Sequence, residues 1–244
     1  ITLLWVIAAI TMSIGNVLAL LQNNIKRVLA YSSVAHSGYM LVGLAALHTV
    51  PQQGLAGVLF YLAAYGLMNT GAFGVLMLLP PRDGRDDAAE TFEDLAGQGR
   101  RHVGLGLAMA VCCFSLIGIP LTVGFLGKLL LIKPALNGSL TWLAIILIVN
   151  AAVSAAYYLR IVATMFLRTD GPAAEAPVPG IPATQPQLAV RLGVVLSVLL
   201  TLLFGAIPPA AQMLTANATT GSQLSAQTPA EPAALATRMA ILPN

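Results

Sequence analysis

Six long runs of apolar residues constrain the fold of this chain more than any other feature. A helix needs about 20 apolar residues to cross the hydrocarbon core of a bilayer, and six runs of the sequence reach that length. They cover residues 1–21, 28–47, 54–79, 103–132, 140–167 and 188–207. Because they do not alternate in polarity as the strands of a membrane barrel do, the sequence predicts an all-α, polytopic bundle of six transmembrane helices within residues 1–208.

The composition excludes several classes of protein. Of the 244 residues, 57% are hydrophobic and only 21 are charged, 12 basic and nine acidic, and ten of these charges lie between Arg82 and Arg101. Such a chain is not a soluble enzyme domain. The basic residues stand singly or in pairs at the ends of apolar runs, which argues against nucleic-acid binding. No phosphate loop, paired carboxylate, metal cluster or CxxC motif occurs, so we expect no cofactor or metal in this chain.

The distribution of basic residues predicts the orientation in the membrane. Basic residues gather in the cytoplasmic connections of membrane proteins. Nine lie on one side and two on the other: Lys26, Arg27, Arg82, Arg85, Arg100, Arg101, Arg160, Arg168 and Arg191 against Lys133 and Arg238. The first, third and fifth connections are therefore expected in the cytoplasm. The polar segment 209–244 is expected to be a mobile tail on the external side, and residues 91–97 a short amphipathic helix at the membrane surface.

Lys128 is the most informative polar residue, because a charged group at membrane depth is costly and usually functional. It follows Gly118-Ile-Pro120-Leu-Thr-Val-Gly-Phe-Leu-Gly. Pro120 removes a backbone donor and the glycines weaken the helix, so the fourth run should be broken at Gly118–Pro120. Non-helical backbone at this depth lines a cavity or is buried in protein. The alternative is a lysine that extends to the surface, as expected for Lys133.

A second set of polar residues lies on one face of the second run. Ser32, His36 and Tyr39 recur at helical spacings of four and three, and an imidazole can relay a proton because both its nitrogens form hydrogen bonds. Tyr65 and Asn69, with Tyr61, share a face of the third run. Hydrogen bonds that only hold helices together are the alternative. Lys26, at a run end, has the position of an interface anchor.

Two motifs resemble a known family. Residues 24–39, Asn-Ile-Lys-Arg-Val-Leu-Ala-Tyr-Ser-Ser-Val-Ala-His-Ser-Gly-Tyr, and residues 118–128, ending in Lys128, are similar in order and spacing to the antiporter-like membrane subunits of respiratory complex I. Within that family the chain is most similar to the N-type subunits. The L and M types carry histidines and a lysine in the helix that matches the third run, and residues 60–71 here have neither.

The resemblance implies a fold and a function. The fold is the second of two inverted repeats, so the chain is expected to be a fragment or one part of a split subunit. The function is proton translocation coupled to quinone reduction, with Lys128, His36 and Lys26 transferring protons and with Ser32, Tyr39, Tyr65 and Asn69 supporting them. NADH, FMN, iron–sulfur clusters and quinone are expected in other subunits. The expected partners are the neighbouring membrane subunits and the lipid bilayer, and the Ala- and Leu-rich composition favours a bacterial inner membrane.

Three alternatives remain open on the sequence. The first is a subunit of a multi-subunit cation/proton antiporter, whose chains share the broken helix. The second is a structural scaffold of complex I that does not itself pump. A quinone-binding site is the least favoured, since no residue pattern suggests a headgroup pocket.

Overall fold

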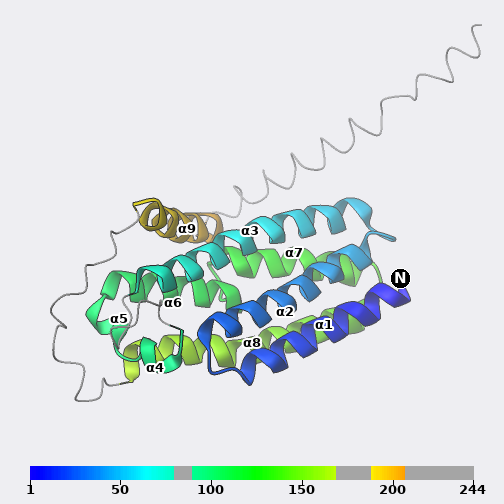
Figure 1. Ribbon diagram of the computed structural model, residues 1–244. Coiled ribbons are helices and arrows are strands. Elements are labelled where there is room, and N and C mark those ends of the chain that lie inside the picture. The colour runs from blue at the N-terminus through cyan, green and yellow to red at the C-terminus, as the bar shows by residue number, and fades with distance from the viewer. Residues whose placement is uncertain (80–89, 169–187, 207–244) are drawn as a thin grey trace, which may run out of the picture.

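A bundle of helices makes up the described part of the chain (Figure 1), which in this computed structural model comprises residues 1–79, 90–168 and 188–206. These residues contain no strand beyond a single antiparallel bridge between Asn24 and Thr91. Their helices are α1 (Thr2–Leu20), α2 (Ile25–Ala46), α3 (Pro51–Leu78), α4 (Phe92–Leu95), α5 (Gln98–Arg101), α6 (Val103–Ile117), α7 (Val123–Asn137), α8 (Thr141–Leu167) and α9 (Leu188–Ala206). The predicted all-α fold is confirmed.

Five of these helices, α1, α2, α3, α8 and α9, are long and apolar enough to cross a membrane. Helices α6 and α7 have 15 residues each, which gives each a length of about 22 Å, less than the roughly 30 Å of a hydrocarbon core. They follow each other in the chain, with a non-helical segment from Gly118 to Thr122 between them. The chain is thus a polytopic membrane bundle with one broken helix at the predicted place.

Several helices extend beyond the apolar runs, because capping residues and not hydropathy determine where a helix starts. Helix α2 begins at Ile25, three residues before its run, where the Asn24 side chain accepts a hydrogen bond from the Arg27 amide at 3.1 Å. Helix α3 begins at Pro51, a residue that suits the first turn since it lacks an N–H. Helix α7 continues through Pro134 to Asn137.

Helix α2 lies at the centre of the bundle, where close approach to α1 is possible because small residues face each other. A Cβ atom at Gly15 would lie 2.6 Å from the Ala35 nitrogen, and one at Gly38 would lie 2.7 Å from the Met12 nitrogen. The two halves of this helix belong to two buried apolar clusters, the first half to one around Leu29 and Met68 and the second half to one around Val42 and Leu143. By contrast, α1 and α9 expose many large apolar side chains, as helices that face lipid or other subunits do.

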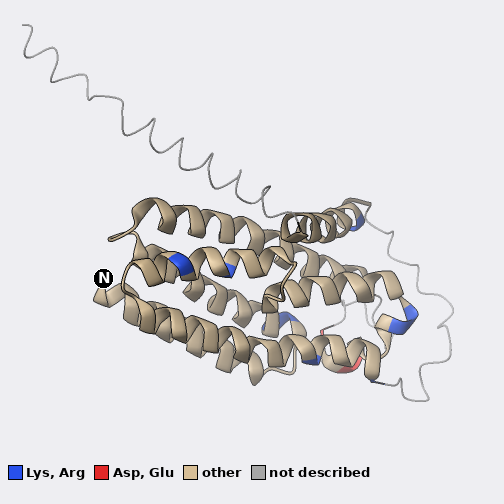
Figure 2. Ribbon diagram, turned by 180° about the vertical axis from the view of Figure 1, so that it is seen from behind, with Lys and Arg blue, Asp and Glu red and all other residues tan. Residues whose placement is uncertain are grey.

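The described basic residues are concentrated at one end of the bundle (Figure 2). At this end lie the N-termini of α2 and α9, helix α5 and the C-terminus of α8 (Figure 1), which carry Lys26, Arg27, Arg100, Arg101, Arg160, Arg168 and Arg191. Lys133 is on α7, towards the opposite end. Arg82, Arg85, Arg238 and the tail 209–244 fall outside the described residues. Below, the end with the seven basic residues is called the basic end.

Candidate functional site

The broken helix leaves two carbonyl groups for a buried lysine. Helix α6 ends at Gly118, whose φ of 92° belongs to the left-handed region that favours glycine. Lys128 of α7 is only 6% exposed, and its Nζ donates hydrogen bonds to the carbonyl oxygens of Leu116 at 2.9 Å and Ile117 at 2.7 Å. The last carbonyls of a helix have no partner within it and form the negative end of its dipole. The Lys128 amine therefore caps α6, and Pro120 lies exposed in the break.

His36 connects three helices through its two ring nitrogens. It is fully buried on α2, with Nδ1 at 2.7 Å from the Tyr61 hydroxyl of α3 and Nε2 at 3.2 Å from the Tyr158 hydroxyl of α8. The Tyr65 ring stacks on the imidazole, with centroids 4.7 Å apart. Ser32 is hydrogen-bonded to the same Tyr158 hydroxyl. A hydroxyl on each nitrogen is the arrangement that a proton relay requires, because the imidazole can accept on one side and donate on the other.

Tyr39 adjoins both of these sites. Its ring centroid lies 5.3 Å from Lys128 Nζ and 5.2 Å from the His36 ring, and its hydroxyl accepts a hydrogen bond from Asn16 Nδ2 at 3.2 Å. Among the described residues no hydrogen bond joins Lys128 to His36 directly. The face predicted from Ser32, His36 and Tyr39 thus forms a continuous buried cluster with Lys128, and Tyr39 is the residue that both contact.

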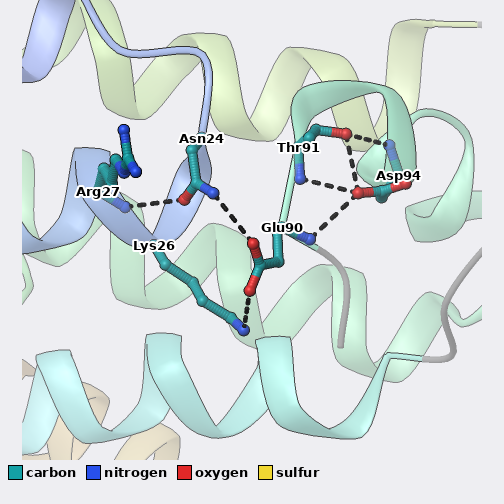
Figure 3. A network of polar contacts seen from close by, with 6 residues as sticks. All are labelled: Asn24, Lys26, Arg27, Glu90, Thr91 and Asp94. Carbon is teal, nitrogen blue, oxygen red and sulfur yellow. Dashed lines mark hydrogen bonds and ion pairs between the residues drawn. The ribbon is translucent and has the colours of Figure 1, made fainter. Parts of the chain in front are cut away.

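Two of the candidate residues lie apart from this cluster. Asn69 is partly buried on α3 and makes no hydrogen bond to the described part of the chain. Lys26 is at the basic end, where its Nζ forms an ion pair with Glu90 at 2.8 Å and its side chain is 39% exposed. Figure 3 shows this pair beside Asn24, whose Nδ2 donates to the second carboxylate oxygen at 3.2 Å. The hydrogen bond from Lys26 lowers the pKa of the Glu90 carboxyl.

Two participants in the buried cluster were not identified from the sequence. Asn16 was not singled out, yet its Nδ2 also donates to Asn150 Oδ1 at 3.0 Å, and its Oδ1 accepts from the Tyr157 hydroxyl at 2.9 Å. Tyr158 was not singled out either. The available signal was the register of α8, because Asn150, Tyr157 and Tyr158 are seven and eight residues apart and so share a face.

The described residues contain no group of three or more His, Cys, Asp or Glu side chains that could hold a metal ion. Cys112 and Cys113 are both buried and free.

Comparison with known proteins identifies a matching family and several relatives. Residues 1–154 match the family model described as NADH:quinone oxidoreductase/Mrp antiporter, TM. NADH-quinone oxidoreductase subunit N of Salinibacter ruber is 48% identical over 173 residues, which cover 70% of this chain and 34% of that protein. The chain thus spans about a third of the length of this curated relative.

Solved structures share the fold. A chain of respiratory complex I from Thermus thermophilus with bound aureothin matches 85% of this chain and 44% of its own length, with a TM-score of 0.66 and 31% identity. A chain of the Mrp complex from Dietzia matches 92% of this chain and 48% of its own, with a TM-score of 0.73 and 22% identity, which shows the fold alone. The resemblance to antiporter-like subunits of the N type is confirmed. The chain belongs to the NADH:quinone oxidoreductase/Mrp antiporter transmembrane family.

Proposed function

We propose that this chain is the C-terminal, proton-translocating part of a subunit N of complex I, and that Lys128 is the group that holds and releases the proton. One observation carries this proposal: a buried lysine at a helix break is bound to two backbone carbonyls and shares its neighbour Tyr39 with a histidine that has a hydroxyl on each nitrogen. Charged side chains inside membrane bundles commonly mark ion pathways. The curated relatives named as subunit N support the assignment to complex I.

The proposed cycle alternates between two states of Lys128. In the protonated state the ammonium is bound by Leu116 O and Ile117 O at the C-terminus of α6. When quinone reduction elsewhere in the complex brings another positive charge nearer, the neutral amine becomes favoured and the proton leaves towards the external side. Withdrawal of that charge lets the amine take up a proton again, with the His36 cluster as the source.

In this scheme His36 relays protons between hydroxyl groups. A proton accepted at one ring nitrogen allows the other nitrogen to donate, to Tyr61 on one side or Tyr158 on the other. Tyr39 and Tyr65 orient the imidazole through ring contacts, and Ser32 acts through its hydrogen bond to the Tyr158 hydroxyl. Asn69 and Lys26 lie outside the cluster. In this scheme they can only assist protons that move from the basic end towards the cluster.

Proton pumping in inverted membrane vesicles with Lys128→Ala tests the proposal, with quinone reduction by NADH measured on the same preparation. We expect the number of protons pumped per electron to fall while the complex stays assembled. Lys133→Ala is the matched control, because Lys133 lies on the same helix and is exposed. Unchanged pumping in Lys128→Ala would overturn the role of Lys128, and an equal loss in both variants would show a non-specific effect.

His36→Gln tests the relay separately. Glutamine keeps hydrogen-bonding groups for Tyr61 and Tyr158 but cannot take up a proton near neutral pH. We expect pumping to fall with assembly intact. Full pumping in this variant would leave His36 as a residue that only connects α2, α3 and α8.

Two other functions compete with this one. A cation/proton antiporter subunit has the same fold, as the Mrp chain shows, but the curated relatives are complex I subunits. Co-purification with quinone-reducing subunits separates the two. A scaffold without pumping is favoured by one observation, namely that Lys128 already has a structural task in capping α6. Lys128→Arg separates these roles, because arginine can still donate hydrogen bonds to the end of α6 but stays charged and so cannot release a proton.

The wider setting is part of the same proposal. Neighbouring membrane subunits of complex I are the expected partners, and a bacterial inner membrane is the expected location, with the basic end in the cytoplasm and the segment after Pro208 outside. NADH, FMN, iron–sulfur clusters and quinone would be held by other subunits of that complex.

A further inference from the structure

A cavity of about 630 Å³ opens at the basic end of the bundle. Its walls come from the α1–α2 connection, the start of α2, the Thr91–Glu93 segment and the last turns of α8. Three arginines line it, Arg27, Arg160 and Arg168, against a single acidic side chain, Glu93. The proposed proton path does not use any of these residues.

The three arginines are held differently. Arg160 is fixed, because its guanidinium lies 4.0 Å from the centroid of the Phe92 ring and its Nη2 donates to Asn23 Oδ1 at 3.0 Å. Arg27 follows the cap of α2, so it stands in the first turn, at the positive end of a 22-residue helix dipole. Arg168 is exposed at the C-cap of α8. All three arginines are exposed. Arg160 is thus held in place by its contacts, and the other two arginines, on different helices, can close on a ligand.

The charge and donor set of this cavity suit a phosphate group. Arginine presents a planar fork of N–H donors that binds phosphate oxygens in pairs. Basic pockets between transmembrane helices on the cytoplasmic side are typical binding sites for anionic lipid headgroups. Glu93 lowers the net positive charge of the cavity but leaves an excess of two arginines over it.

Apolar surface next to the cavity favours a phospholipid over a free phosphate as the ligand. Leu21 lines the cavity and is 71% exposed, and Leu167, the neighbour of Arg168, is 74% exposed. Both stand at the ends of membrane-spanning helices, α1 and α8. A phospholipid in the cytoplasmic leaflet would place its headgroup among the arginines and its acyl chains along these leucines, whereas a free phosphate would leave the leucines in water.

We propose that the cavity lined by Arg27, Arg160 and Arg168 binds the phosphate-bearing headgroup of an anionic phospholipid. The bound lipid bridges α2 and α8, the two helices that hold His36 and Tyr158. It therefore fastens the basic end of the bundle around the buried cluster without taking part in proton transfer.

Native mass spectrometry of the purified, delipidated complex tests this proposal, with phosphatidylglycerol and phosphatidylcholine added separately. We expect the wild-type complex to retain phosphatidylglycerol at least threefold more than phosphatidylcholine. The double variant Arg27→Gln/Arg168→Gln should lose this preference, while Arg160 is left intact because of its contacts with Phe92 and Asn23. Arg191→Gln is the matched control, since Arg191 is an exposed arginine at the same end but outside the cavity.

The outcomes distinguish a bound lipid, a bound free anion and the absence of a binding site. Equal retention in the double variant, or an equal loss in Arg191→Gln, would overturn the proposal. Displacement of phosphatidylglycerol by millimolar sodium phosphate would assign the cavity to a free anion and overturn the proposal of a bound lipid.

If the double variant fails to assemble, Arg27→Lys/Arg168→Lys serves instead. Lysine keeps the positive charges but lacks the planar set of N–H donors of a guanidinium group, so we expect a weaker preference for phosphatidylglycerol. An unaltered preference would contradict recognition by the guanidinium groups. Lys128→Ala should bind the lipid as wild type does, so the two proposals fail independently.

Discussion

Asn16 shows how one neutral side chain can join three transmembrane helices. Its amide on α1 donates to the Tyr39 hydroxyl on α2 and to Asn150 on α8, and it accepts from the Tyr157 hydroxyl. The residue is fully buried. A buried polar group that loses its partner has a cost in free energy, so these bonds depend on one another.

Asn16→Leu should therefore destabilise the chain. Interhelical hydrogen bonds in membranes contribute roughly 0.5–2 kcal/mol, and this substitution leaves the Tyr157 hydroxyl and Asn150 without their shared partner. We expect the free energy of unfolding, measured by titration with a denaturing detergent, to fall by about 1–2 kcal/mol.

Asn69→Leu is the control for this measurement. Asn69 is partly buried on α3 and has no hydrogen bond within the described chain, so the free energy of unfolding should change by less than about 0.5 kcal/mol. Equal losses in the two variants would mean that the hydrogen bonds of Asn16 do not stabilise the bundle.

At the scale of elements, the broken helix depends on close contact between its two halves. A Cβ atom at Gly124, in the first turn of α7, would overlap with the carbonyl oxygen of Ser115 in α6. That oxygen belongs to the backbone and cannot move as a flexible side chain would. The Ser115 hydroxyl also accepts a hydrogen bond from the Gly124 amide at 3.1 Å.

Gly124→Ala should accordingly separate the halves and disturb the Lys128 cap. Overpacking of this kind costs about 1–3 kcal/mol or more, and we expect the amount of folded chain in the membrane, measured by quantitative immunoblotting, to fall several-fold. Gly66→Ala on α3 is the control, because a Cβ there meets nothing within 4 Å. A normal amount of Gly124→Ala chain would contradict the close contact.

An ion pair between Lys26 and Glu90 connects the segment before α4 to α2, and this pair depends on pH. Lys26 holds the pKa of Glu90 below its ordinary value of 4.5, chiefly through the hydrogen bond between them. A carboxyl with a depressed pKa stabilises the folded state above its unfolded pKa, and this contribution is lost as the pH falls through the folded value. The link should therefore be present at pH 6 and be lost only below pH 4.5, as the pH falls through the lowered pKa of Glu90.

Hydrogen exchange of the amides of residues 91–95 measures this effect, with Glu90→Gln compared at each pH so that intrinsic exchange rates cancel. We expect wild type to be better protected than Glu90→Gln at pH 6, and we expect the difference to vanish once the pH has fallen below the lowered pKa of Glu90. Asp94 of the capping box at Thr91 is present in both chains. A difference that persists at the lowest pH would exclude the Lys26–Glu90 pair as its cause.

At the scale of the whole molecule, the sequence predicts elements better than their contacts. The apolar runs and Pro120 predict the helices and the break, because in lipid the backbone must satisfy its own hydrogen bonds and proline cannot. No local signal pairs His36 with Tyr158, which is 122 residues away. That contact depends on which helices pack together, so Tyr158 and Asn16 emerge only from the fold.

The orientation of the bundle can be tested because the two ends differ in charge. Seven described basic residues lie at the basic end, and such residues are retained in the cytoplasm. Single cysteines at two exposed positions report the two ends: Gln52→Cys in the first turn of α3 and Arg101→Cys at the end of α5. Cys112 and Cys113 are buried and should give only the background labelling of the wild-type chain.

A membrane-impermeant maleimide should label Gln52→Cys in right-side-out vesicles and Arg101→Cys in inverted ones. The reason is that Gln52 lies in the first turn of α3, directly after the α2–α3 connection, which has no Lys or Arg, whereas Arg101 lies at the basic end. Labelling of both positions after permeabilisation is the control for reactivity. The opposite pattern would place the basic end outside the cell, and the release of protons by Lys128 would then be directed to the cytoplasm.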